Sequence, residues 1–265
     1  MPPRATLVVP TLDEASSIGH VLRTFRTAAD EANRTLFASQ PIEWEVLVVD
    51  GASTDGTAAL AEAEGARVVT ERRPGYGRAY KTGFAAATGE VLATADGDAT
   101  YPVEIIPSLV RRLKDDSLDF ISGNRMAYLD RRAMTTEHRV GNRALNMVLG
   151  LAFHRYLKEM PTGPLVDSQS GFWVFRRDVL EHVHLGQDGM AFSEELKIEV
   201  VLRGMRVAEV PIHYGERWGR PKLSSWRDGY RNMLFILRKR LAVAREQARG
   251  APIPFARDPE AAAPP

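Results

Sequence analysis

The segment Glu90-Val-Leu-Ala-Thr-Ala-Asp96-Gly-Asp98 is the clearest indication of the fold, because an apolar run leads directly into two carboxylates. Such a run is typical of a strand that is buried on both faces of a sheet. Side chains at positions i and i+2 of an extended segment point the same way, so Asp96 and Asp98 face one point beyond the strand. We therefore expect a ligand site at the carboxyl edge of a parallel sheet.

Strand patterns alternate with helical patterns along the chain. We expect strands at about 5–10, 44–50, 67–70, 90–96, 119–123, 172–175 and 206–212. We expect helices at about 16–38, from 54 onward, and at 76–88, 103–114, 136–157, 192–203 and 226–247. This alternation predicts an α/β fold with a mostly parallel sheet and helices on both faces.

Composition narrows the class of protein. The 265 residues carry a net charge of +1 and no cysteine, which argues against nucleic acid as a partner and excludes disulfides, thiolate catalysis and cysteine-bound zinc. No apolar run reaches the ~20 residues that span a bilayer, so we expect a cytoplasmic protein that is at most peripheral to the inner face of the membrane. We expect one domain over residues 1–249 and a disordered Pro/Ala-rich tail over residues 250–265.

Asp96 and Asp98 are the leading candidates for metal ligands. Two neighbouring carboxylates repel each other and raise each other's pKa. A hard cation such as Mg²⁺ or Mn²⁺ relieves this repulsion, and diphosphate oxygens can complete its coordination shell. The alternative is a turn with two solvated carboxylates, but the preceding strand and the sheet edge favour the metal site.

A second motif, Val48-Val-Asp50-Gly-Ala-Ser53-Thr-Asp55-Gly56, follows an expected strand. Asp50 lies at a strand end, where an acid can accept hydrogen bonds from a base or a ribose. Ser53 or Thr54 is expected to cap the next helix, with Asp55 favouring its dipole.

A glycine-rich basic motif begins the helix expected at 76–88. Gly75 and Gly77 let backbone approach a ligand, and Arg78 and Lys81 favour an anion there. A solvated basic turn is equally compatible with this motif.

Three motifs lie in the second half of the chain, each with an alternative. The polar run Asp167-Ser-Gln169-Ser170 is either part of a site or a turn. Glu194, Glu195 and Glu199 form either a catalytic cluster or a solvated acidic helix face. The loop from Arg217 to Lys222 either closes on phosphates or is a solvated connection.

Together these motifs resemble glycosyltransferase family 2, most closely the soluble polyprenyl (dolichyl) phosphate mannosyl- or glucosyltransferases. The resemblance runs from Ala5 to about Arg240 and implies the GT-A fold, a Rossmann-like sheet with a nucleotide-sugar half to about residue 125 and an acceptor half over 126–249. The segments that carry it are Val9-Pro-Thr-Leu-Asp-Glu14, Val48-Val-Asp-Gly-Ala-Ser53, Gly75-Tyr-Gly-Arg-Ala79, Asp96-Gly-Asp98, Gly123-Asn-Arg125, Asp167-Ser-Gln-Ser-Gly-Phe172, Glu209-Val-Pro211 and Gly219-Arg-Pro-Lys-Leu223.

The resemblance also implies roles for individual residues. Asp96 would lie near the nucleotide and the metal, and Asp98 would bind Mg²⁺ or Mn²⁺ directly. Thr100 stands where relatives often have a third ligand, so water would complete the shell. The residues expected to bind the nucleotide sugar or other substrate are Pro10, Leu12, Glu14, Asp50, Ser53, Gly77, Arg78, Lys81, Gln169, Arg220 and Lys222. The residues expected to act in catalysis, besides the two acids, are Arg125, Ser170, Glu195 and Arg217.

The expected reaction is an inverting single displacement that moves a hexose from GDP-mannose or UDP-glucose to a polyprenyl phosphate. An anionic lipid phosphate needs cations rather than a base, and these would be Arg125, Arg131, Arg217 and Lys222. A hydroxyl on a soluble acceptor would instead need a carboxylate base, for which the candidates are Glu194, Glu195 and Asp167.

Two other classes of protein, and a membrane contact, stay open as alternatives. A sugar nucleotidyltransferase would typically carry a glycine-rich loop where this chain has Pro10-Thr-Leu-Asp-Glu14. A non-catalytic nucleotide-sugar-binding protein would not need the intact acid pair. The basic helix expected at 226–247 is suited both to an anionic membrane surface and to packing against the core.

Overall fold

A computed structural model describes residues 3–129, 136–158, 165–219 and 225–249. Its centre is one seven-stranded sheet with the strand order β3-β2-β1-β4-β6-β5-β7. The strands are β1 (Arg4–Thr11), β2 (Glu43–Asp50), β3 (Arg67–Thr70), β4 (Val91–Thr94), β5 (Phe120–Leu129), β6 (Trp173–Arg176) and β7 (Val207–Tyr214). All seven expected strands are confirmed, with boundaries that shift by a few residues and a β5 that runs further than predicted.

The sheet is mostly parallel, as predicted. β1 pairs in parallel with β2 and β4, β2 with β3, and β5 with β7. β6 runs antiparallel to both β4 and β5. Because β2 and β4 lie on opposite sides of β1, the strand order reverses there, and ligands of such sheets bind beyond the carboxyl ends of the strands at this switch point.

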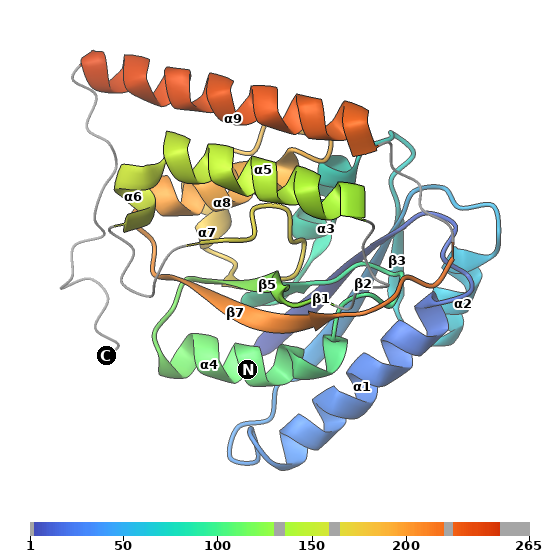
Figure 1. Cartoon of the computed structure of the whole chain (residues 1–265). Coiled ribbons are helices and arrows are strands. Elements are labelled where there is room, and N and C mark those ends of the chain that lie inside the picture. Colours follow the sequence, from blue (N-terminus) through green and yellow to red (C-terminus); the bar gives the residue numbers. More distant parts are fainter. Residues whose placement is uncertain (1–2, 130–135, 159–164, 220–224, 250–265) are drawn as a thin grey trace.

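Helices cover both faces of the sheet (Figure 1). One face carries α1 (Ile18–Arg34) and α4 (Ile106–Asp115), which follows the short turn η1 (Val103–Ile105). The other carries α3, α5, α8 and α9. The helices not yet given bounds are α2 (Thr57–Ala63), α3 (Tyr76–Ala86), α5 (Thr136–Ala152), α6 (His154–Lys158), α7 (Val179–His182), α8 (Phe192–Leu202) and α9 (Ser225–Ala248).

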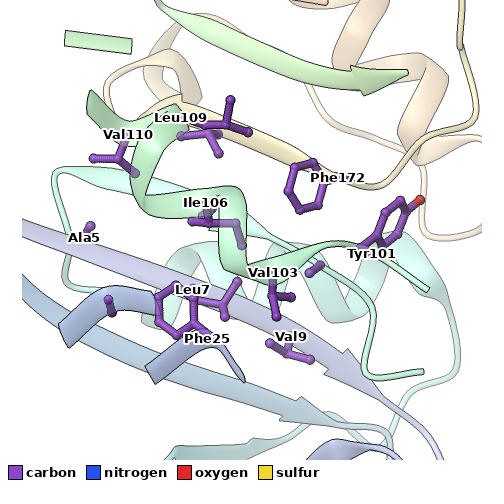
Figure 2. Close-up of a cluster of buried hydrophobic side chains, with 14 of the residues drawn as sticks. Ala5, Leu7, Val9, Phe25, Tyr101, Val103, Ile106, Leu109, Val110 and Phe172 are labelled. Carbon is purple, nitrogen blue, oxygen red and sulfur yellow. The ribbon is translucent and has the colours of Figure 1, made fainter. Parts of the chain in front are cut away.

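Apolar strands explain the two cores. Along β1, Leu7 and Val9 point into the core beneath α1 and α4, where Phe25 and Ile106 meet them (Figure 2). Val8 points into the opposite core, beneath α3 and α8. A strand that alternates between two apolar cores must be mostly apolar, which is the pattern of Leu7, Val8 and Val9 in the sequence.

Two helix predictions need correction. The helix expected at 136–157 is divided into α5 and α6, and α7 was not expected. Every residue of α8 is buried, so the interpretation of Glu194, Glu195 and Glu199 as a solvated face is wrong. The helix lies against α3, α6 and α9, which leaves it no face toward water.

Candidate active site

The loops that follow β1 and β2 are hydrogen bonded to each other. The carboxylate of Asp50, at the end of β2, accepts hydrogen bonds from the backbone N–H and the hydroxyl of Ser53 at 2.9 and 2.6 Å. Asp13, after β1, accepts one from the N–H of Thr54 at 2.8 Å. The prediction that Ser53 or Thr54 caps the next helix is wrong, because α2 begins at Thr57 without a side-chain cap. These residues instead join two loops at the carboxyl edge of the sheet.

Backbone strain marks the same edge. Asp13, Ala52 and Ala99 have φ angles of 48°, 61° and 64°, a left-handed conformation that non-glycine residues rarely adopt. They follow β1, β2 and β4, whose ends meet at the switch point. Strain of this kind collects at functional sites, where the surrounding structure holds it in place.

Three predicted nucleotide-pocket residues lie at the end of β1. Pro10 is partly buried, and Leu12 exposes its side chain beside Gly51. Glu14 is buried, and its backbone N–H donates to the hydroxyl of Thr57 at 2.8 Å. The structure therefore offers one apolar and one acidic side chain at this edge.

Asp98 lies at the centre of the predicted metal site. One of its oxygens accepts hydrogen bonds from the backbone N–H and the hydroxyl of Thr100 at 3.1 and 2.6 Å. The other lies 2.9 Å from Nη1 of Arg217. Arg217 also donates to Glu14, so one guanidinium bridges acids from two loops. Thr100, expected where relatives often have a third metal-side ligand, orients Asp98 here.

Asp96 lies under two tyrosines. Its Oδ1 accepts hydrogen bonds from the hydroxyls of Tyr80 and Tyr76 at 3.3 and 3.4 Å. Burial, followed by the charge of Asp98, raises the pKa of Asp96 to about 7. Sequence reasoning missed these tyrosines, although their spacing of four residues in a helix places them on one face.

The donor set fits a hard cation only if phosphate and water supply further ligands. Among the described residues, no group of three or more His, Cys, Asp or Glu side chains could hold a metal ion. Asp96 and Asp98 nevertheless bring carboxylate oxygens, which Mg²⁺ and Mn²⁺ prefer, to one place. Mg²⁺ in particular keeps several waters and binds proteins through one or two carboxylates together with substrate phosphates.

Arg125 and Asp167 form a buried, bidentate ion pair. Nε and Nη2 of Arg125 donate to the two carboxylate oxygens of Asp167 at 2.8 and 2.9 Å. Burial alone would raise the pKa of Asp167, but the charge and hydrogen bonds of Arg125 outweigh it and lower the pKa to about 2. In this structure each of the two is the other's partner, and the roles of Arg125 toward a phosphate and of Asp167 as a base stay predictions.

A buried lysine supports the same loop. Nζ of Lys197 donates to the backbone oxygen of Asp167 at 2.5 Å, and Glu209 accepts the backbone N–H of Asp167 at 2.9 Å. Burial lowers the pKa of Lys197 to about 8. Sequence reasoning did not select Lys197, although it is the one lysine in the otherwise mainly apolar and acidic helix α8.

Gln169 and Ser170 lie in this loop as well. Ser170 is buried and its hydroxyl accepts the N–H of Phe172 at 3.3 Å. The amide of Gln169 donates to Glu194 and accepts from Asn232 of α9 at 3.1 Å. Glu194 is fully buried, and this burial raises its pKa to about 8.

The remaining acids of α8 also have structural partners. Glu195, a predicted catalytic residue, accepts the backbone N–H of Gln187 at 2.7 Å. Glu199 pairs with Arg203 at 3.1 Å and with Lys239 of α9. These contacts tie α8 to its neighbours.

The cations of the predicted anion site at the start of α3 have a partner within the chain, and the anion site stays a prediction. Arg78 and Lys81 both pair with Asp188, the lysine at 2.5 Å, so a carboxylate of the chain already meets these cations. A Cβ on Gly77 would lie 2.6 Å from Cβ of Phe192. This glycine is therefore required for packing of α3 against α8. Asp188 had no recognisable signal in the sequence.

Some predicted residues lie outside the described part of the chain. They are the cations Arg131, Arg220 and Lys222 and the tail over residues 250–265. Within the described residues, the structure brings Glu14, Asp98 and Arg217 into one ion-paired cluster, with Asp50, Asp96 and Ser53 on the adjacent strand ends.

The mixed α/β sheet with an Asp-X-Asp acid pair at its carboxyl edge matches the GT-A glycosyltransferases, and comparison with known proteins agrees. The model of the family described as glycosyl transferase family 2 matches residues 6–183. The chain belongs to glycosyltransferase family 2.

Relatives with known names point the same way. A dolichyl-phosphate hexose transferase of Haloferax volcanii is 32% identical over 223 residues, which cover 84% of this chain and 88% of that protein. The low-salt glycan biosynthesis hexosyltransferase Agl6 of the same organism is 30% identical over 237 residues. That match covers 89% of this chain but only 53% of Agl6, so the chain spans about half the length of that relative.

Solved structures share the fold. Glucosyl-3-phosphoglycerate synthase from Mycobacterium tuberculosis, in complex with Mn²⁺, uridine diphosphate and phosphoglyceric acid, superimposes with a TM-score of 0.70 at 21% identity. The match covers 90% of this chain and 78% of that one.

Among the described residues, no helix combines the length and apolarity required to cross a bilayer.

Proposed function

We propose that this chain is an inverting, metal-dependent hexosyltransferase that transfers a hexose from a nucleotide sugar to a polyprenyl phosphate. The observation that carries the proposal is the cluster of Glu14, Asp98 and Arg217 at the switch point, which combines acids for a divalent cation with a cation for phosphate. The dolichyl-phosphate hexose transferase among the relatives supports the acceptor. The neighbour crystallised with Mn²⁺ and uridine diphosphate supports the cofactor and the donor class.

On the donor side, Asp98 and Asp96 would hold Mg²⁺ or Mn²⁺, with Thr100 orienting Asp98. A bound cation would neutralise the charge on the departing nucleoside diphosphate. The guanidinium of Arg217 would move from the carboxylates to a phosphate, for which its planar donors are well suited. Leu12 would give the base an apolar surface, and Asp50 would accept from the ribose.

On the acceptor side, an oxygen of the lipid phosphate forms a bond to the anomeric carbon. The bond from that carbon to the diphosphate oxygen breaks at the same time, and the diphosphate keeps the electron pair. No proton has to be removed, so no general base is needed. The state of the three candidate bases supports this acceptor, because Asp167 is ion-paired, Glu194 is fully buried and Glu195 accepts a backbone N–H.

Transfer can be tested with purified protein, GDP-mannose or UDP-glucose, and a short-chain polyprenyl phosphate, with Mn²⁺, Mg²⁺ or a chelator. We expect a polyprenyl-phosphate hexose and a nucleoside diphosphate, and loss of both with the chelator or with Asp98→Asn. Asp116→Asn, which changes an exposed carboxylate on a surface ion pair, is the matched control and should keep full activity. Transfer only to phosphoglycerate or to a sugar hydroxyl would refute the lipid acceptor, and release of pyrophosphate would identify a nucleotidyltransferase.

Two broader expectations are part of the same proposal. Residues 1–249 would form a single catalytic domain, and the protein would work in the cytoplasm at the inner face of the membrane. Fractionation of cells that produce the full chain would test the location.

A further inference from the structure

Two helices on one side of the sheet expose large apolar side chains. On α5, Val140, Met147 and Leu151 are 65%, 62% and 74% exposed. Their spacing of seven and four residues places them on one helix face. The opposite face of α5 buries Leu145 and Leu149 in the core, so the exposed stripe is not needed for packing.

Helix α9 repeats this arrangement. Tyr230, Leu237 and Leu241 are 59%, 45% and 58% exposed, again at a spacing of seven and four residues. Its other face buries Ile236 and Val243. α5 and α9 pack against each other on the same side of the sheet (Figure 1).

Positive charge is concentrated in the same segments. Residues 136–158 and 225–249 contain eleven Arg or Lys and three Asp or Glu, a net charge of +8. Because the whole chain carries +1, the rest of it carries −7. The exposed cations include Arg143 on α5 and Arg231, Arg238 and Arg245 on α9. Glu246 is the one acid that α5, α6 and α9 contribute among the side chains that the structure describes.

The two helices also contact the loop of the candidate site. Asn146 of α5 accepts the hydroxyl hydrogen of Ser168 at 2.6 Å. Asn232 of α9 donates to Gln169 at 3.1 Å. A partner bound on α5 and α9 would therefore lie on the predicted acceptor half, on helices that contact this loop.

We propose that α5 and α9 form a docking surface for an anionic lipid bilayer, with their apolar stripes in the headgroup region and their arginines on lipid phosphates. Apolar stripes combined with a basic surface are the chemistry of helices that lie in a membrane interface. An acidic protein or a nucleic acid would match the charge but not the apolar stripes, and a second copy would bring two basic surfaces together. The purpose of this surface, access to a lipid substrate, rests on the proposed lipid-phosphate acceptor. Binding to vesicles, in contrast, can be measured without any transfer reaction.

The test is co-sedimentation of the full chain with vesicles of phosphatidylcholine, alone or mixed with phosphatidylglycerol. We expect binding to the anionic vesicles that weakens with added salt. Replacement of Arg238 and Arg245 by Gln should weaken it about fivefold for each arginine, equal to about 1 kcal/mol each. L151E and L241E should each weaken it about tenfold or more, whereas L60E, which changes an exposed leucine on α2, should not.

Circular dichroism and transfer to a short-chain acceptor serve to show that the variants fold. Equal binding to neutral and anionic vesicles, or unchanged binding by L151E and L241E, would overturn the proposal. The proposal would also be overturned if the protein did not bind vesicles and light scattering showed a dimer that L151E dissociates. Vesicle binding without any transfer to polyprenyl phosphate would refute the proposed acceptor but support this surface, and transfer without vesicle binding would refute the surface alone.

Discussion

Nη1 of Arg217, which follows β7, lies 2.9 Å from Oδ2 of Asp98, which follows β4. The same guanidinium donates to Glu14. A cation of the chain therefore balances Asp98, the acid that a metal would engage, and Glu14 beside it. If the metal binds at Asp98, it competes with Arg217 for that carboxylate.

Arg217→Gln should separate two properties of the enzyme. Transfer should fall by about 10²–10³-fold, because a charged donor to the developing diphosphate is lost. Binding of Mn²⁺ without nucleotide should become tighter, because the competing cation at Asp98 is gone. Steady-state kinetics and Mn²⁺ titration by electron paramagnetic resonance measure the two. Arg111→Gln, on a surface pair with Asp115, should change neither, and weaker Mn²⁺ binding by Arg217→Gln would contradict the competition.

Thr100→Val should weaken Mn²⁺ binding about 10–100-fold, the usual effect of losing a side chain that orients a metal ligand. The hydroxyl of Thr100 donates to Asp98 at 2.6 Å, and valine removes that donor at similar volume. Thr100→Ser keeps the hydroxyl and should keep the affinity. Isothermal titration calorimetry would measure both variants, and equal affinity in the two would show that this hydrogen bond has no such role.

Metal affinity should depend on pH through Asp96. Burial and the charge of Asp98 raise the pKa of Asp96 to about 7, so below that pH a proton must leave before a cation binds. Apparent affinity for Mn²⁺ should fall by up to about tenfold for each unit below pH 7 and level off above it. Titrations between about pH 5.5 and 8.5 test this. Asp96→Asn should bind more weakly and lose the step near pH 7; a step that survived in this variant would belong to another group.

The Arg125–Asp167 pair should contribute to stability at neutral pH. Removal of one buried partner typically costs about 3–5 kcal/mol, because the other charge stays buried without a counter-ion. Arg125→Met should therefore unfold at much lower urea concentration than the native chain. Asp115→Asn, which breaks an exposed pair, should cost less than about 1 kcal/mol, and similar losses in the two variants would contradict the role of burial.

The ion pair of Arg125 and Asp167 should also make the free energy of unfolding fall at acid pH. The folded pKa of Asp167, about 2, is lowered from its ordinary value of 3.8. Its stabilisation, on the order of 2 kcal/mol, is thus complete above about pH 4 and is lost as the pH falls toward 2. Urea unfolding at about pH 3 and pH 7 should show this loss in the native chain. Asp167→Asn should show less of it, and an equal loss in both would assign it to other carboxylates.

The strands and helices of this chain could be predicted well, because apolar periodicity is a local property. β1 and β4 are mostly apolar at their buried positions, and Asp96 and Asp98 come soon after β4, so both the sheet and the acid pair at its edge were recognisable. The position of Glu14, Asp50 and Asp98 at strand ends follows from the same pattern. The order of the strands did not, since β6 runs antiparallel between two parallel groups.

Local pattern, then, was sufficient for the elements of the sheet and for the acids at its carboxyl edge. The partners of the charges depended on folding in three dimensions. Arg78 and Lys81 meet Asp188, Arg125 meets Asp167, and Arg217 meets Glu14 across 203 positions of the chain. Pairing of charges depends on distance in space, and only the packed sheet and helices bring such residues within reach of each other.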